Sequence, residues 1–145
     1  MKIEELQKCL DEINPKDIET LNELVSEAPD VIILGNGGSN SISTHIAEDY
    51  SKVINKRALA FSDTARMSCY ANDYGWENAN RVFLEHFVNN GTLVVLISAS
   101  GESQNIINCV DYCEQKGVNY ITLSGKSPGN RLRTMSINGK HNKLN

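Results

Sequence analysis

The sequence has no long apolar run, no excess of basic residues and no signal-peptide layout. None of its apolar stretches approaches the roughly 20 residues needed to cross a bilayer as a helix, so we expect no membrane partner. The formal net charge of -4 argues against a nucleic-acid partner and against an anionic membrane surface. The first five residues are acidic and lack the basic segment followed by an apolar segment that begins a signal peptide. A cytoplasmic location is therefore expected by default.

The four cysteines show no CxxC spacing and do not form a disulfide framework for a chain of this size. Cys109 and Cys113 are four residues apart on a predicted helix, where they could share a metal ion. Cys113 is also in register with the apolar residues of that helix. We therefore favour buried free thiols.

The 145 residues are enough for one domain with a sizeable core. Apolar residues at helical spacing predict two leading helices, and we assign residues 1–28 to this helical segment. The main domain is predicted at 29–138 and a polar tail at 139–145. Within the main domain, short apolar runs alternate with helical patterns, which predicts an α/β fold with a parallel sheet covered on both faces. The predicted strands are 31–34, 58–61, 92–97, 118–123 and 134–138.

Three of the predicted strands are followed by loops rich in glycine and serine. In open parallel sheets, ligands bind beyond the carboxyl ends of the strands. Glycines let the backbone approach a ligand, and hydroxyls and helix-start amides suit an anion. Such loops are also the ordinary way for a strand to turn into a helix, but two on neighbouring strands favour a phosphate site. The loops are GNGGSNS (35–41), SASGES (98–103) and SGKS (124–127), and the first two contain no basic residue.

Two nucleotide-binding motifs are not met. The first loop lacks the GxGxxG spacing because Asn40 stands where the third glycine belongs. Gly125-Lys126-Ser127 resembles the end of a P-loop, but Tyr120 stands where its first glycine belongs. We therefore expect no nucleotide cofactor.

The predicted helix after the first loop carries the best candidates for catalysis. His45 and Asp49 are four residues apart and share a helix face, with Glu48 beside them. They could share a proton or a metal ion, although two ligands fall short of the three or four of a zinc site. The alternative is an ordinary surface helix. Asn72 and Asp73, in the segment NDYGW (72–76), either line a sugar pocket or form a turn.

Taken together, these segments resemble the sugar isomerase (SIS) domain family, and within it the phosphoheptose (sedoheptulose-7-phosphate) isomerases. The resemblance covers roughly residues 30 to 138, in the order and spacing of the family. It implies a doubly wound, flavodoxin-like, five-stranded parallel sheet in three layers and a homotetramer with active sites between subunits. The matching stretches are GNGGS (35–39), HIAEDYS (45–51), SDTARMSCYANDYG (62–75), SASGES (98–103), NII (105–107) and KGVNYITLSGK (116–126).

The resemblance also implies an aldose–ketose isomerisation through an enediol. Asp49 aligns with the carboxylate implicated in proton transfer, and Glu48 is the second candidate. His45 aligns with a position that binds zinc in some members together with the carboxylate four residues on, which makes zinc a candidate cofactor. The substrate-binding positions implied by the motifs are Asn36, Gly37, Gly38, Ser39, Asn72, Asp73, Ser98, Ser100 and Ser103, the serines holding the phosphate.

Three departures from the family pattern bear on activity. Asp49 is one methylene shorter than the usual glutamate, and Ala99 stands where threonine is frequent. No segment after residue 138 matches the family's last helix, with its glutamine and catalytic histidine, and His141 is a poor substitute. Three interpretations stay open: an isomerase with impaired activity, a non-catalytic phosphosugar-binding module such as a sensor or partner subunit, and a truncated isomerase.

Overall fold

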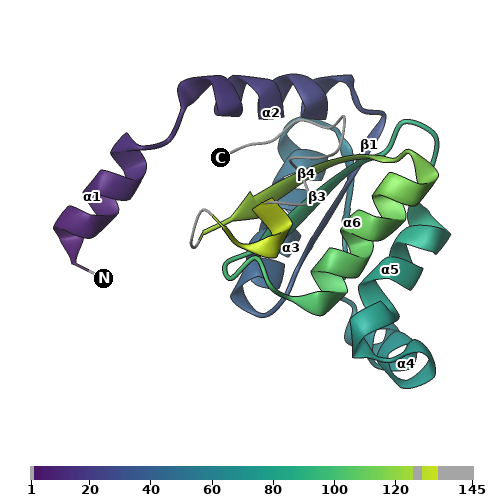
Figure 1. Cartoon of the computed structure of the whole chain (residues 1–145). Helices are drawn as coiled ribbons and strands as arrows, with labels where there is room; N and C mark the ends of the chain where they lie inside the picture. Colours follow the sequence, from purple (N-terminus) through teal and green to yellow (C-terminus); the bar gives the residue numbers. More distant parts are fainter. Residues whose placement is uncertain (1, 126–128, 134–145) are drawn as a thin grey trace.

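The computed structural model describes residues 2–125 and 129–133 and shows a parallel α/β sheet with helices on both faces (Figure 1). The described strands have the order β2-β1-β3-β4, and every neighbouring pair is parallel. Four of the predicted strands are confirmed, whereas the predicted strand 134–138 lies outside the described residues. The strands are β1 (Asp30–Gly35), β2 (Arg57–Ala60), β3 (Leu93–Ser98) and β4 (Asn119–Ser124).

The alternation of side chains along β1 divides the core into two clusters. Ile32 and Leu34 face one side of the sheet, where they join apolar residues of α4 (Thr64–Tyr74), α5 (Trp76–Phe87) and α6 (Gln104–Lys116). Val31 and Ile33 face the other side, where they join residues of α2 (Pro15–Glu27) and α3 (Gly38–Val53). Because successive strand residues point to opposite faces, a continuous apolar run is buried on both. The layers are therefore helix, sheet and helix.

Three of the helices begin or end at a recognisable capping residue. Asn14 caps α2 by accepting from the Lys16 amide at 3.1 Å, and Gly117, in the left-handed region at φ 67°, ends α6. Asp63 caps α4 through the Arg66 amide at 2.7 Å, so α4 begins directly after this residue. The helices are α1 (Ile3–Asp11), α2 (Pro15–Glu27), α3 (Gly38–Val53), α4 (Thr64–Tyr74), α5 (Trp76–Phe87) and α6 (Gln104–Lys116).

Helix α1 lies apart from the sheet (Figure 1) and contains no buried residue. Its apolar stripe is exposed, with Ile3 84% accessible and Leu6 and Leu10 about half accessible. None of the helices in residues 2–125 and 129–133 has the length and apolar character to cross a membrane.

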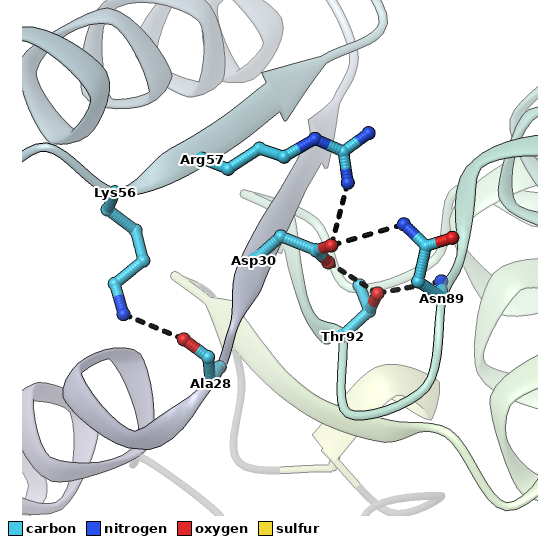
Figure 2. Close-up of polar contacts among 6 residues, drawn as sticks. All are labelled: Ala28, Asp30, Lys56, Arg57, Asn89 and Thr92. Carbon is cyan, nitrogen blue, oxygen red and sulfur yellow. Dashed lines mark hydrogen bonds and ion pairs between the residues drawn. The ribbon is translucent and has the colours of Figure 1, made fainter.

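The amino edge of the sheet is closed by a network around Asp30 (Figure 2). The Asp30 carboxylate is buried and accepts from the Arg57 guanidinium at 2.8 Å and from the Asn89 amide at 3.1 Å. It also accepts from the Thr92 hydroxyl. Beside it, the Lys56 ammonium donates to the Ala28 carbonyl at 2.7 Å. These bonds connect the starts of β1, β2 and β3.

Candidate functional site

The carboxyl edge of the sheet brings the first two glycine- and serine-rich loops together. The loop after β1 leads into α3 and the loop after β3 leads into α6, and β1 pairs directly with β3. The turn into α3 is tight, since a Cβ on Gly35 would lie 2.7 Å from the Ser39 backbone. Gly37 adopts φ 52°, a conformation that favours glycine. Neighbouring strands therefore place the two loops side by side, as predicted.

A pocket of about 220 Å³ opens between these loops, and we call it the serine pocket. The described residues that line it carry no formal charge. Five of the predicted substrate-binding residues contribute polar side chains to it. The lining residues are Asn36, Ser39, Ile97, Ser98, Ala99, Ser100 and Ser103.

The serine hydroxyls of the pocket lie within reach of one another. The Ser98 hydroxyl donates to the Ser103 Oγ at 3.3 Å and lies 3.5 Å from the Ser100 Oγ. Ser98 and Ser100 also accept from the loop amides of Gly101, at 3.1 Å, and Glu102, at 3.2 Å. The loop backbone therefore holds two of the three hydroxyls in place.

Ser103 occupies the N-cap of α6, yet its hydroxyl does not cap the helix. It is directed instead toward Ser98. The first amides of a helix carry partial positive charge, which favours an anion at this position. The serine pocket thus combines hydroxyl donors with the positive end of α6. Gly37 and Gly38 form the exposed start of α3 and are not among the residues that line the pocket.

A second pocket of about 430 Å³ lies along α3, and we call it the histidine pocket. His45 and Glu48, two of the predicted catalytic residues, both line it. Asp49 is not among the lining residues, but its Oδ2 lies 3.4 Å from the His45 Nε2. The side chains of His45 and Asp49 are 76% and 46% accessible. The lining residues are Asn40, Ser41, Thr44, His45, Glu48 and Ser62.

His45 and Asp49 alone do not fit a zinc site. Protein zinc sites take three or four ligands, and this pair supplies two. Among residues 2–125 and 129–133, no group of three or more histidine, cysteine, aspartate or glutamate side chains is arranged to hold a metal ion. Any zinc site at this helix would need ligands beyond those that the structure describes.

Asn72 and Asp73 are exposed in the last turn of α4, and neither lines the two pockets. Asn72 donates to the Asp73 carboxylate at 2.9 Å, and the Cys69 thiol also bonds to that carboxylate. The turn expected within this segment is at Gly75, where φ 80° separates α4 from α5. The described chain does not bring Asn72 and Asp73 to the serine residues.

The two cysteines of α6 are buried and free, which confirms their interpretation as packing residues. Burial raises the pKa of the Cys113 thiol to about 12. Burial likewise raises the pKa of Cys109 well above its usual value. Both side chains therefore stay neutral at physiological pH and are poor metal ligands.

Sequence reasoning missed two features of this edge. Asn105 is 3% exposed, and its side chain pairs with that of Asn36. The sequence signal for this pair was a polar residue, Asn105, in register with the apolar positions of α6.

The segment 129–133 also packs on the second loop, because the Leu132 amide donates to the Gly101 carbonyl at 3.0 Å and the Arg131 amide donates to Glu102 at 2.9 Å. No local pattern indicates that long-range contact.

Comparisons with known proteins agree with this arrangement. The sequence model of the SIS domain matches residues 2–125. The chain is 34% identical over 137 residues to the phosphoheptose isomerase of Sodalis glossinidius, covering 88% of this chain and 71% of the relative. It is 32% identical over 122 residues to the phosphoheptose isomerase of Cytophaga hutchinsonii, covering 81% of this chain and 64% of the relative.

A solved structure of similar fold is the phosphoheptose isomerase of Neisseria gonorrhoeae. It has a TM-score of 0.83 and 24% sequence identity, over 99% of this chain and 79% of that one. At this identity, the likeness supports the fold alone. The match of the domain model and the identity to the Sodalis protein establish the relationship: this chain belongs to the SIS domain family and is related within it to the phosphoheptose isomerases.

Proposed function

We propose that this protein is a phosphosugar isomerase of the phosphoheptose type, which interconverts the aldose and ketose forms of sedoheptulose 7-phosphate or a similar sugar phosphate. The observation that carries the proposal is that one helix, α3, connects two different pockets. Its first turn borders the serine pocket, and its middle contributes a histidine and a carboxylate to the histidine pocket. The curated relatives named phosphoheptose isomerase support the same activity.

The phosphate is assigned to the serine pocket. Ser98, Ser100 and Ser103 supply hydroxyl donors, and the start of α6 supplies partial positive charge. Ser39 and Asn36 donate from the opposite loop, while Gly37 and Gly38 let the backbone approach. Neutral donors can balance a phosphate dianion when several converge on it, because hydrogen bonds to a charged acceptor are stronger than neutral ones.

The reacting carbons are assigned to the histidine pocket. Ser39 and His45 are six residues apart on α3, so their backbones are separated by about 9 Å along the helix axis. That separation is comparable to the length of an extended seven-carbon sugar phosphate. The two side chains are also about 120° apart around the helix axis, so the proposal requires that the substrate curve around α3 to bring its other end to His45.

The chemistry moves one proton between two carbons. A carboxylate removes the proton from the carbon beside the carbonyl, and the carbonyl oxygen takes a proton to give an enediol. The same carboxylate then returns the proton to the neighbouring carbon, while the other oxygen loses its proton and becomes the carbonyl. We assign the carboxylate to Asp49, which contacts His45 beside the pocket, and Glu48, which lines the pocket, is the second candidate. General acid–base catalysis of this kind contributes about 10²–10⁴-fold.

Two further features belong to the proposal. The exposed apolar stripe of α1 supports a homo-oligomer, a tetramer by family resemblance, in which a second copy covers that stripe. Asn72 and Asp73, remote from the pockets in the described chain, would then complete the substrate site of a neighbouring subunit. Zinc enters the proposal only as an additive in the activity assay, because His45 and Asp49 alone do not form a zinc site.

The proposal is tested by incubating the protein with sedoheptulose 7-phosphate, with and without zinc, and measuring product formation. We expect turnover, and we expect Asp49→Asn to lower kcat by about 100-fold or more because the proton acceptor is removed. Glu48→Gln is the matched control on the adjacent carboxylate and should lower kcat by less than about tenfold.

The opposite ranking of the two variants would transfer the acid–base role to Glu48. Thermal stabilisation by sedoheptulose 7-phosphate without any turnover would show a binding module rather than an isomerase. A ligand at 100 times its Kd adds roughly 2.7 kcal/mol to stability, which a thermal shift assay resolves easily. Absence of both turnover and stabilisation would refute the assignment of the two pockets.

A further inference from the structure

The side-chain amides of Asn36 and Asn105 form a reciprocal pair between the two loops of the serine pocket. Each Nδ2 donates to the Oδ1 of the other residue at 2.8 Å, across a sequence separation of 69 residues. Asn36 lines the pocket, whereas Asn105 is 3% exposed and is not among the lining residues. We propose that Asn105 is a positioning residue that holds the Asn36 amide in place at the wall of the pocket, where it meets the bound sugar phosphate. This inference rests on the function proposed above.

The pairing controls which groups Asn36 presents to a ligand. A carboxamide has two N–H donors and one oxygen with two lone pairs, and the pair uses one donor and one lone pair of each residue. Rotating the Asn36 amide by half a turn would set oxygen against oxygen and nitrogen against nitrogen. Loss of both hydrogen bonds alone disfavours that orientation by about thirtyfold. Asn36 therefore keeps its observed arrangement of donor and acceptor as long as the Asn105 amide keeps its own orientation, since only a simultaneous half turn of both amides would restore the two bonds.

Asn105 is itself held firmly. It is the second residue of α6, and its neighbours Ile106 and Ile107 are fully buried in the core. Its backbone carbonyl accepts a hydrogen bond from the Cys109 thiol, one turn further along the helix. The position of the Asn105 side chain is thus set by a helix that packs in the core, and that position determines where the Asn36 amide can pair.

The pair also fixes the distance between the two walls of the pocket. Asn36 lies on the wall formed by the loop after β1, next in space to Ser39, and Asn105 follows Ser103 on the other wall. A hydrogen-bonded bridge between the walls keeps the serine donors converging before the ligand arrives. Such preorganisation lowers the cost of binding.

A double-mutant cycle on the full chain separates positioning from general stabilisation. The variants are Asn36→Ala, Asn105→Leu and the double variant, and the Kd for sedoheptulose 7-phosphate is measured by calorimetry together with kcat and KM. We expect each single variant to raise Kd by about tenfold, and the double variant to raise it by about tenfold rather than a hundredfold. Non-additivity is expected because Asn105 acts through Asn36.

Asn108→Leu is the matched control, since Asn108 lies one turn further along α6 and donates to the Glu77 carbonyl outside the pocket. It should leave Kd within about twofold. The inference is overturned if the two single effects multiply, or if Asn105→Leu lowers stability without changing Kd. Should Asn105→Leu fail to fold, NMR of the wild-type protein decides: contacts between the two side-chain amide groups support the pair, and their absence overturns it.

The proposed function is tested separately, by measurements on the wild-type protein. If the wild-type protein binds sedoheptulose 7-phosphate without turnover, the proposed isomerase activity is refuted. The Kd values of the double-mutant cycle would still test the positioning role of Asn105. Failure of the wild-type protein to bind sedoheptulose 7-phosphate would overturn both.

Discussion

The polar groups at the two edges of the same sheet have opposite surroundings: those at the amino edge are bonded to one another, and those at the carboxyl edge face an open pocket. At the amino edge, the Asp30 carboxylate is buried and satisfied by Arg57, Asn89 and Thr92 (Figure 2). At the carboxyl edge, the serine pocket holds neutral side chains around an open volume of about 220 Å³. The amino edge is internally matched, whereas the carboxyl edge has donors arranged around space that a ligand can enter.

The difference follows from how the strands run. In a parallel sheet all strands begin at one edge and end at the other, so the helix N-termini that follow the strands gather at the carboxyl edge. Their partial positive charge favours an anion there. A buried carboxylate at the amino edge has no such helix ends to interact with and is paired with an arginine. Stability and binding should therefore respond to mutation at different edges.

The largest expected effect comes from placing a negative charge at the carboxyl edge. Ser100→Asp should weaken the binding of sedoheptulose 7-phosphate by about 1,000-fold, because two like charges about 4 Å apart repel by about 4 kcal/mol at a protein surface. Calorimetric titration provides the measurement. The uncharged variant Ser100→Asn should lose only about tenfold. Equal affinity of the two variants would mean that the phosphate lies elsewhere.

The next effect is at the amino edge and concerns stability. Asp30→Asn should lower the free energy of unfolding by about 2–3 kcal/mol, because three donors face this buried carboxylate and an amide offers them a single acceptor oxygen. Urea denaturation measures it. Asp63→Asn is the matched control, since asparagine caps a helix as well as aspartate and the change should stay within about 0.5 kcal/mol. A large loss of sugar-phosphate affinity in folded Asp30→Asn would contradict the separation of the two edges.

The smallest expected effect is on ligand binding at the carboxyl edge. Ser103→Ala should raise the Kd for sedoheptulose 7-phosphate by about tenfold, since one hydroxyl donor to the phosphate is lost. The free energy of unfolding should change by less than about 0.5 kcal/mol, because this hydroxyl does not cap α6. Ser68→Ala on exposed α4 serves as the control for both measurements. A stability loss with unchanged Kd would identify Ser103 as a structural residue.

Much of the fold could be predicted from local patterns. The apolar runs at 31–34 and 92–97 coincide with β1 and β3 within one residue, because a strand buried on both faces has no polar position to disturb its pattern. The exposed helix α4 has no comparable local signal, because its start depends on the Asp63 cap and none of its residues is buried. The predicted strand 134–138 lies outside the described residues.

The candidate site was predicted in part. The loop serines were found because glycine and serine after a buried strand are locally visible, and adjacency of β1 and β3 then brought them together. The Asn36–Asn105 pair was not found, because its hydrogen bonds join residues distant in sequence. Sequence spacing put His45 and Asp49 on one helix face, but only the structure showed Glu48, rather than Asp49, lining the pocket with His45.

The sequence by itself determined the alternation of strands and helices, the two glycine- and serine-rich loops and the helix that carries His45 and Asp49, because each depends on residues close together in the chain. Only the tertiary structure decided which loops share a pocket, which polar groups satisfy one another and which stay open to a ligand. Those properties depend on the order of strands in the sheet and on hydrogen bonds between distant residues, and local periodicity contains no information about either.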